Sequence, residues 1–175
     1  MSKLLILDVF GLLCAKLNPD TPALLPIIQE TKHYRVVARP HLKEFLAAVF
    51  SRYTVAIFSS SSYYNVSSVL NTVMTRGQLN SCLFIWTRDR THLDPEGEHE
   101  HSTVKRLSDV LDNPVLNSKR AHSWSNTLMC DDTLSKMAAN PEGNVLTCQE
   151  FTGDAGDAYL LTLLGEIEGK FAAMR

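Results

Sequence analysis

The chain has 175 residues, of which 45% are hydrophobic and 21% are charged, and its formal net charge is -2. These values are typical of one globular domain, and they exclude the strong positive charge by which proteins attract nucleic acids or anionic membranes. The N-terminus lacks a signal-peptide pattern and no apolar run approaches the ~20 residues that span a bilayer, so we expect a cytoplasmic or nuclear location.

Short apolar strands alternate with segments of helical periodicity in the first half of the chain. Residues 17–38 contain Pro19, Pro22 and Pro26, which disfavour a long regular element, and we interpret this stretch as a small insertion. The elements expected in this half are a strand over 3–7, a strand over 34–38, a helix over 41–52, a strand over 53–58 and a helix over 65–76 that ends at Gly77.

The second half continues this alternation. The expected elements are a strand over 83–86, a polar loop over 88–102 with Pro95 and Gly97 as breakers, a short helix over 104–111, a strand over 126–130, one or two helical turns within 133–139, a strand over 145–147 and a helix over 157–173. This order predicts an α/β fold in which a mostly parallel sheet is flanked by helices on both faces. No repeat or linker suggests a second domain, so residues 1–175 are expected to form one. The four cysteines are spread singly, which favours buried free thiols.

Polar side chains follow three of the expected strands at the point where each strand ends. Asp8 follows the first strand, Ser59 follows the strand over 53–58, and Asp131 with Asp132 follows the strand over 126–130. The carboxyl ends of parallel strands face one crevice, where open α/β sheets bind ligands. Acids and a hydroxyl are therefore expected to converge there.

These residues could carry out phosphoryl transfer. A strand-end carboxylate, here Asp8, can attack a phosphate ester and form an aspartyl phosphate that water later hydrolyses. Asp8 and Asp131 could hold magnesium, while Ser59 and Lys105 could bind and neutralise the phosphate. Each residue alone also has a structural reading, as a turn former, a helix cap, a polar loop or a solvated charge. The order of these residues along the chain favours a role in phosphoryl transfer.

Several motifs are similar to those of a known family. They are Leu5-Ile-Leu-Asp8 with Gly11-Leu-Leu13, Ala38-Arg-Pro-His-Leu-Lys-Glu-Phe45, Ile57-Phe-Ser-Ser60, Val104-Lys-Arg-Leu-Ser108, and Asn126-Thr-Leu-Met-Cys-Asp-Asp-Thr133 followed by Asn140-Pro141. With them the chain resembles the haloacid-dehalogenase (HAD) superfamily, and within it the RNA polymerase II carboxy-terminal-domain phosphatases and NLI-interacting-factor-like proteins. The resemblance implies a Rossmann-like HAD fold without a large cap domain, and a magnesium-dependent phosphatase for phosphoserine or phosphothreonine in flexible protein segments.

The resemblance also implies a role for each matching residue. Asp8 corresponds to the nucleophile, Ser59 with Ser60 to the phosphate-binding hydroxyls, and Lys105 to the lysine that neutralises the phosphate. Asp131 corresponds to a metal-holding carboxylate and Asp132 to a residue that supports the water shell of the metal. In this family the backbone carbonyl at the position of Phe10 also contacts the metal.

One position departs from the family pattern. The signature Asp-x-Asp-x-Thr reads Asp8-Val9-Phe10-Gly11-Leu12 in this chain. The missing second aspartate protonates the leaving oxygen and then activates water in the family, a role worth about 10²- to 10⁴-fold in rate. Phenylalanine can do neither, so turnover is expected to slow or stop while metal and phosphate capture survive. Equally, Phe10 could simply fill a crevice that no longer needs to hold water.

Two main functions remain open at this stage. The first is a slow phosphoprotein phosphatase, whose missing acid could be replaced from the insertion or from a loop that carries Asp89, His92, Asp94, Glu96, His99 and His101. The second is a catalytically inactive relative that binds a phosphorylated or flexible protein segment, for which a mitochondrial protein-import receptor of this family is a precedent. A phosphatase for a small metabolite is less favoured, because nothing in the chain looks large enough to enclose one. The sequence leaves the oligomeric state open.

Overall fold

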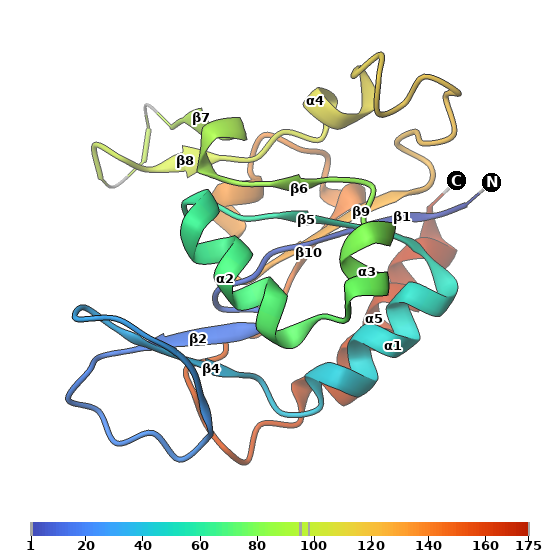
Figure 1. Cartoon of the computed structure of the whole chain (residues 1–175). Coiled ribbons are helices and arrows are strands. Elements are labelled where there is room, and N and C mark those ends of the chain that lie inside the picture. Colours follow the sequence, from blue (N-terminus) through green and yellow to red (C-terminus); the bar gives the residue numbers. More distant parts are fainter. Residues whose placement is uncertain (1, 95, 98, 175) are drawn as a thin grey trace.

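The computed structural model describes residues 2–94, 96–97 and 99–174, and its centre is a five-stranded parallel sheet with the order β10-β9-β1-β5-β6 (Figure 1). The strands are β1 (Leu4–Leu7), β5 (Thr54–Phe58), β6 (Ile85–Trp86), β9 (Thr127–Asp131) and β10 (Val145–Thr147). All four residues of β1 are fully buried, as expected for the central strand of a sheet that is covered on both faces. The predicted α/β fold with a parallel sheet is confirmed.

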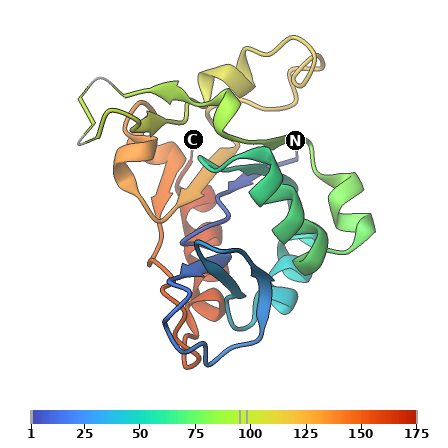
Figure 2. The same ribbon diagram turned by 60° about the vertical axis from the view of Figure 1, so that its left-hand side comes forward.

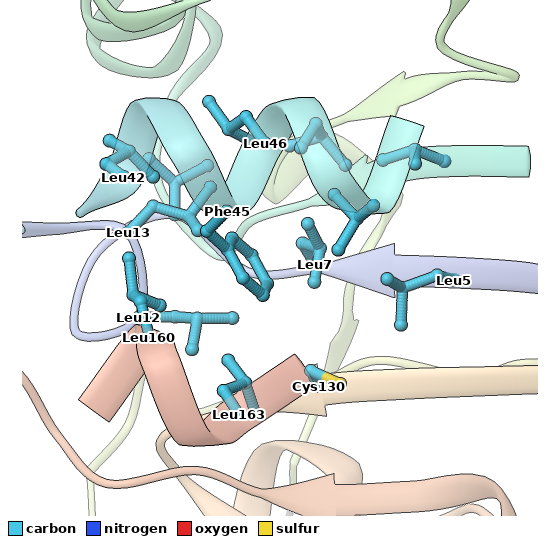
Figure 3. Close-up of a cluster of buried hydrophobic side chains, with 14 of the residues drawn as sticks. Leu5, Leu7, Leu12, Leu13, Leu42, Phe45, Leu46, Cys130, Leu160 and Leu163 are labelled. Carbon is cyan, nitrogen blue, oxygen red and sulfur yellow. The ribbon is translucent and has the colours of Figure 1, made fainter. Parts of the chain in front are cut away.

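Helices cover the two faces of this sheet unequally. The helices are α1 (Leu42–Arg52), α2 (Tyr63–Val73), α3 (Arg76–Ser81), α4 (Ser108–Leu111) and α5 (Tyr159–Ala173), with 3-10 turns at Arg88–Arg90, Leu134–Met137 and Glu142–Asn144. Leu5 and Leu7 of β1 point toward the larger core, where leucines of α1 and α5 pack around them (Figure 3). Leu4 and Ile6 point to the other face, which α4 and the turn Leu134–Met137 cover.

The insertion predicted over 17–38 is more regular than the sequence suggested. It contributes to a three-stranded antiparallel sheet with the order β2-β4-β3, formed by β2 (Cys14–Leu17), β3 (Ile27–Glu30) and β4 (Arg35–Ala38). Only the last strand was predicted. The three prolines lie in the connection between β2 and β3, where no helix or strand forms, so the expectation drawn from them is confirmed, whereas the short strands on either side were missed.

The helix predicted over 65–76 also differs from the structure. It begins at Tyr63 and ends at Val73, and the prediction that Gly77 ends it is wrong because Gly77 lies inside α3. The new helix begins at Arg76, and the N-cap residue Thr75 forms a capping box: Gln78 N donates to Thr75 Oγ1 at 3.1 Å, and Thr75 N donates to Gln78 Oε1 at 2.9 Å. This reciprocal cap was the readable signal for a second helix.

The segment 88–111 holds a short hairpin that was not predicted, and its helix is shorter than predicted. Strands β7 (His92–Leu93) and β8 (Thr103–Val104) pair antiparallel, and α4 begins only at Ser108. Val104 therefore belongs to a strand, so the helix predicted over 104–111 is wrong in its first half. Strands of two residues are too short to show alternation, which explains the error. Pro95, one of the two predicted breakers, lies outside the described residues.

The two hairpin regions flank one edge of the main sheet. The carboxyl ends of β1 and β5 point toward the side where the β2–β4 sheet and the β7–β8 hairpin lie on opposite sides of the sheet plane (Figure 1). Turning this side forward shows the blue β2–β4 sheet below and the yellow-green hairpin above (Figure 2). The strand-end residues singled out from the sequence lie at this edge.

The remaining elements predicted for the second half are present, although the strand predicted over 83–86 is only Ile85–Trp86 and α5 begins at Tyr159, two residues later than predicted. The turn Leu134–Met137 lies within 133–139, and α5 ends where the terminal helix was predicted to end. The cysteines are free, three of them buried and Cys82 partly so. None of the helices in the described part of the chain is long and apolar enough to cross a membrane.

A buried ion pair joins the antiparallel sheet to the rest of the fold. Arg39, just after β4, donates from Nε and Nη2 to the two carboxylate oxygens of Asp157, both at 2.8 Å. Its Nη1 donates to the carbonyl oxygens of Leu12 (3.1 Å) and Gln149 (2.9 Å). The side chains of Arg39 and Asp157 are 0% and 6% exposed. One guanidinium therefore connects β4, the loop after β1 and the segment before α5.

The variant Asp157→Asn is expected to lose about 3–5 kcal/mol of unfolding free energy at pH 7, because Arg39 then remains buried without its counter-charge. Burial alone would raise the pKa of Asp157, but the hydrogen bonds from Arg39 lower it below its ordinary value. The pair therefore stabilises the fold above the ordinary carboxyl pKa, and this contribution is lost as the pH falls below about 4. Urea unfolding at several pH values measures both effects.

The control is Glu30→Gln, which removes an exposed ion pair of 2.7 Å with Arg35 and should cost no more than about 1 kcal/mol. Equal losses in the two variants would contradict the role assigned to the buried pair.

Candidate active site

Three carboxylates meet at the carboxyl edge of the main sheet. Asp8 follows β1, Asp131 is the last residue of β9, and Asp132 comes next. The strands are in register with Leu7 opposite Cys130, and Asp8 N donates to Cys130 O at 3.0 Å. One oxygen from each carboxylate lies within 4.8 Å of the others. The parallel register thus brings together the acids that the sequence placed at two separate strand ends.

Lys105 is the cation of this cluster. Its Nζ donates to Asp8 Oδ1 at 2.8 Å and to Asp131 Oδ2 at 2.5 Å, and its side chain is completely buried. The backbone around it is fixed as well, because Lys105 N donates to Lys136 O at 2.8 Å and Asn140 Nδ2 donates to Lys105 O at 2.8 Å. These contacts exclude the reading of Lys105 as a solvated surface charge.

Burial and proximity shift the pKa values of all three groups. Burial raises the pKa of Asp8 and of Asp131 above the ordinary carboxyl value, and Lys105 only partly offsets this effect. For Lys105, burial acts to lower the pKa, but the two neighbouring carboxylates raise it above its ordinary value. Lys105 is therefore charged at neutral pH, and each acid depends on it to remain ionised.

Gly11 makes room for the third acid. Its φ of +93° belongs to the region that glycine favours, and a Cβ at this position would lie 2.5 Å from Asp132 Cγ. Asp132 Oδ2 accepts a hydrogen bond from Thr133 Oγ1 at 3.2 Å, whereas the buried Oδ1 has no partner among the described residues. Three clustered carboxylates, one with an unsatisfied buried oxygen, fit the oxygen ligands that magnesium takes in proteins.

The serine run lies beside Asp8 in a pocket of about 430 Å³. Ser59 is buried just after β5, and Ser61 N donates to its Oγ at 3.3 Å. Ser60 Oγ is buried and has no partner in the part of the chain that the structure describes. Ser59 lies three residues before Ser62, the residue that precedes α2.

Phe10 lines the same pocket as Asp8 and does not close it. Its ring is partly buried and lies 4.1 Å from the Nζ of Lys16 on β2. Among the described residues that line this pocket, Asp8 is the only acid. The pocket beside Asp8 therefore remains open, but the side chain at the second position of the signature cannot donate a proton.

Three cations that the sequence did not single out also line this pocket: Lys16, Arg88 and Lys136. Isolated basic residues form no pattern along the chain, and Lys16 lies in a strand that was not predicted. The only readable signal was that Arg88 follows the expected strand over 83–86, which ends at the same edge of the sheet.

The loop proposed as a source of a substitute acid has its six candidate residues in different places. Asp94, Glu96, His99 and His101 line a second pocket of about 690 Å³, which shares Ser60, Arg88 and Lys136 with the first. The other two candidates lie elsewhere: Asp89 accepts a hydrogen bond from Thr87 at 2.5 Å, and His92 pairs with Asp109 at 2.6 Å. The four loop residues thus border the site, although they do not line the pocket that contains Asp8.

Lys105→Met should destabilise the fold by about 3–5 kcal/mol at pH 7, because two buried carboxylates lose their counter-charge. Without the ammonium, the already raised pKa values of both acids rise further. The folded variant then holds protons that the unfolded chain has released, so its stability falls as the pH rises above the ordinary carboxyl pKa. Urea unfolding at several pH values from the ordinary carboxyl pKa upward measures the effect.

Lys105→Met/Asp131→Asn provides the matched control, since it removes one of the two stranded acids and should recover part of the loss. A loss below about 1 kcal/mol in the single variant would contradict the account of the cluster.

Comparisons with known proteins identify relatives of this chain. An uncharacterized FCP1 homology domain-containing protein of Schizosaccharomyces pombe is 30% identical over 151 residues, which cover 82% of this chain and 59% of that protein. Two structures of the RNA polymerase II CTD phosphatase Fcp1, one of them a fission yeast variant bound to beryllium fluoride, superpose with a TM-score of 0.56 at 15% and 16% identity.

These Fcp1 superpositions cover 99% of this chain but only about half of the Fcp1 chains, at 50% and 49%. An uncharacterized protein from Listeria monocytogenes matches with a TM-score of 0.58 and 17% identity over 96% of this chain and 98% of its own. At such identities the structures show the shared fold. A family model described as NLI interacting factor-like phosphatase matches residues 3–174, and the chain therefore belongs to that family.

Proposed function

We propose that the protein is a magnesium-dependent phosphatase for phosphoserine or phosphothreonine in flexible protein segments, and that it turns over slowly. The observation that carries this proposal is the buried cluster of Asp8, Lys105 and Asp131 at the edge of a pocket lined by Ser59 and Ser60. Membership of a phosphatase family supports the same reaction class.

Asp8 is the proposed nucleophile. Its Oδ1 is held by Lys105, while its Oδ2 has no hydrogen-bond partner within the described residues. This oxygen would form a bond to phosphorus as the bond from phosphorus to the serine or threonine oxygen breaks, which gives an aspartyl phosphate. The hydroxyls of Ser59 and Ser60 would donate to phosphoryl oxygens, and Lys105 would offset their charge.

The acidic cluster is the proposed metal site. Asp8, Asp131 and the carbonyl oxygen of Phe10 would hold the ion, and Asp132 would support its water shell. When bound, magnesium supplies positive charge that neutralises the phosphoryl oxygens. The partnerless Oδ1 of Asp132 supports this assignment, because a metal-bound water would satisfy it.

Phe10 limits the proposed reaction at two points. The serine or threonine alkoxide that leaves needs a proton, and the water that hydrolyses the aspartyl phosphate must lose one. Phe10 supplies neither function at the position where the family has an aspartate. Good leaving groups such as p-nitrophenolate depart without a proton, so the first step should be less impaired with them than the second. Slow release of phosphate from Asp8 is then the kinetic signature.

The shape of the site favours a protein segment as substrate. Two pockets of about 430 and 690 Å³ adjoin through Ser60, Arg88 and Lys136, which leaves room on both sides of a bound phosphate. A small metabolite would gain little from such an extended surface, because small-molecule sites bury most of their ligand.

Phe10 also favours a second candidate function, a catalytically inactive protein that binds a phosphorylated or flexible segment through the same pocket. Asp8→Asn separates the two candidates. It should abolish any genuine turnover, whereas binding of a partner that survives this change and needs no magnesium would favour the inactive binding protein.

Phe10→Asp is expected to raise magnesium-dependent hydrolysis of a phosphoserine peptide by about 10²- to 10⁴-fold, because it restores the missing acid and base. Phe10→Leu is the matched control, since it alters the same side chain without supplying a proton, and it should stay at the wild-type rate. Release of inorganic phosphate from the purified variants measures the change. If Phe10→Asp releases no more phosphate than the wild type, the protein is not an enzyme that lacks only its general acid and base.

A further inference from the structure

The pocket beside Asp8 is rich in cations. Lys16, Arg88 and Lys136 line it, and none of them forms an ion pair with a carboxylate of the described residues. Lys105, in contrast, is fully engaged with two acids. The pocket therefore carries positive charge in addition to that of Lys105, which pairs with the acidic cluster.

Lys16 is held over the pocket by specific contacts. Its Nζ lies 4.1 Å from the ring centroid of Phe10 and 4.9 Å from that of Tyr34, and it donates to Ser61 Oγ at 3.2 Å. An ammonium over aromatic faces is attracted by their quadrupoles. Lys16 comes from β2, so the antiparallel sheet places a cation against the residue that replaces the missing aspartate.

The charges of the acidic cluster and of the pocket beside Asp8 would leave one positive charge unneutralised. Asp8, Asp131 and Asp132 would bring three negative charges, and a bound serine phosphate would bring about two more at neutral pH. Lys105, one magnesium ion and the three cations Lys16, Arg88 and Lys136 would bring six positive charges, so one remains available for another negative group on the same substrate.

The unneutralised positive charge lies on one side of the bound phosphate. Lys16 lines only the first pocket, whereas Asp94 and Glu96 line the adjoining one. A segment that runs through both pockets would meet a cation on one side of its phosphate and acids on the other. A negative group should therefore be favoured on a single side.

We propose that Lys16 is a specificity-determining residue that binds a second anionic group, a carboxylate or a further phosphate, next to the phosphoserine or phosphothreonine of the substrate segment. This inference rests on the proposed function, because it extends the same phosphate site by one neighbouring residue. Its ligand class is a phosphorylated segment that is acidic on one side.

The test measures binding of peptides that carry a non-hydrolysable phosphonate analogue of phosphoserine, by fluorescence anisotropy in the presence of magnesium. Glu, Gln or a second phosphonate residue is placed at each of three positions on either side. We expect Glu peptides to bind about 2- to 5-fold more tightly than Gln peptides on one side only, as for a partly exposed charge pair, and a second phosphonate to have a larger effect. The preference should shrink at high salt.

Variants assign the preference to Lys16. Lys16→Met should abolish it, Lys16→Glu should reverse it in favour of Lys-bearing peptides, and Lys16→Arg should retain it, which also shows that the site tolerates substitution. Lys43→Met removes an exposed lysine from α1, outside both pockets, and should leave the preference intact.

Two results would overturn this inference while leaving phosphate recognition in place. One is equal binding of Glu and Gln peptides at every position, provided that phosphonate peptides still bind better than unmodified ones. The other is a Glu preference that persists in Lys16→Met. If no phosphonate peptide binds better than its unmodified counterpart, both the inference and the proposed recognition of phosphorylated segments are wrong.

Discussion

The site depends on one buried ammonium. Lys105 bridges Asp8 and Asp131, which come from different strands and would repel each other in a water-poor environment without it. The ammonium without the carboxylates, or the carboxylates without the ammonium, would destabilise the fold, because an unpaired buried charge costs several kcal/mol. The bridge therefore helps both acids to remain ionised and fixes them at the carboxyl edge of the sheet.

The sequence singled out the acids of this cluster and Lys105, but no local pattern showed that Lys105 bridges the two acids. Asp8 and Asp131 were readable because each follows a short apolar strand, and parallel strands end at a common edge. Lys105 is 97 residues from Asp8, and the strand before it has only two residues, so no periodicity reports its position. Its placement depends on tertiary contacts with Lys136 and Asn140, which no local pattern encodes.

Local patterns also separate the elements that the sequence predicted from those that it did not. The main sheet and its long helices follow from apolar runs with clear periods, and they agree with the structure to within a few residues. The β2–β4 sheet was missed in part because its strands have four residues each and three prolines lie in their connection. Lys16 was missed with it, since its contact with Phe10 depends on that sheet.

Phe10 and Lys16 change the character of the site together. A carboxylate is replaced by an aromatic ring, and an ammonium lies over that ring at 4.1 Å. The loss of a negative charge and the presence of a positive one next to Asp8 favour capture of anions over proton transfer. Under the proposed function, this combination would give a slow enzyme with strong substrate binding, and a binding protein would be its limit when turnover stops.

The most direct test of this account is detection of a phosphorylated Asp8. The wild-type protein is mixed with magnesium and p-nitrophenyl phosphate, whose leaving group needs no acid, and is then examined by rapid quench and intact-mass measurement. The account predicts a burst of p-nitrophenolate close to one equivalent and addition of one phosphoryl group to the protein, both absent from Asp8→Asn. No burst and no adduct in the wild type would contradict a nucleophilic role for Asp8.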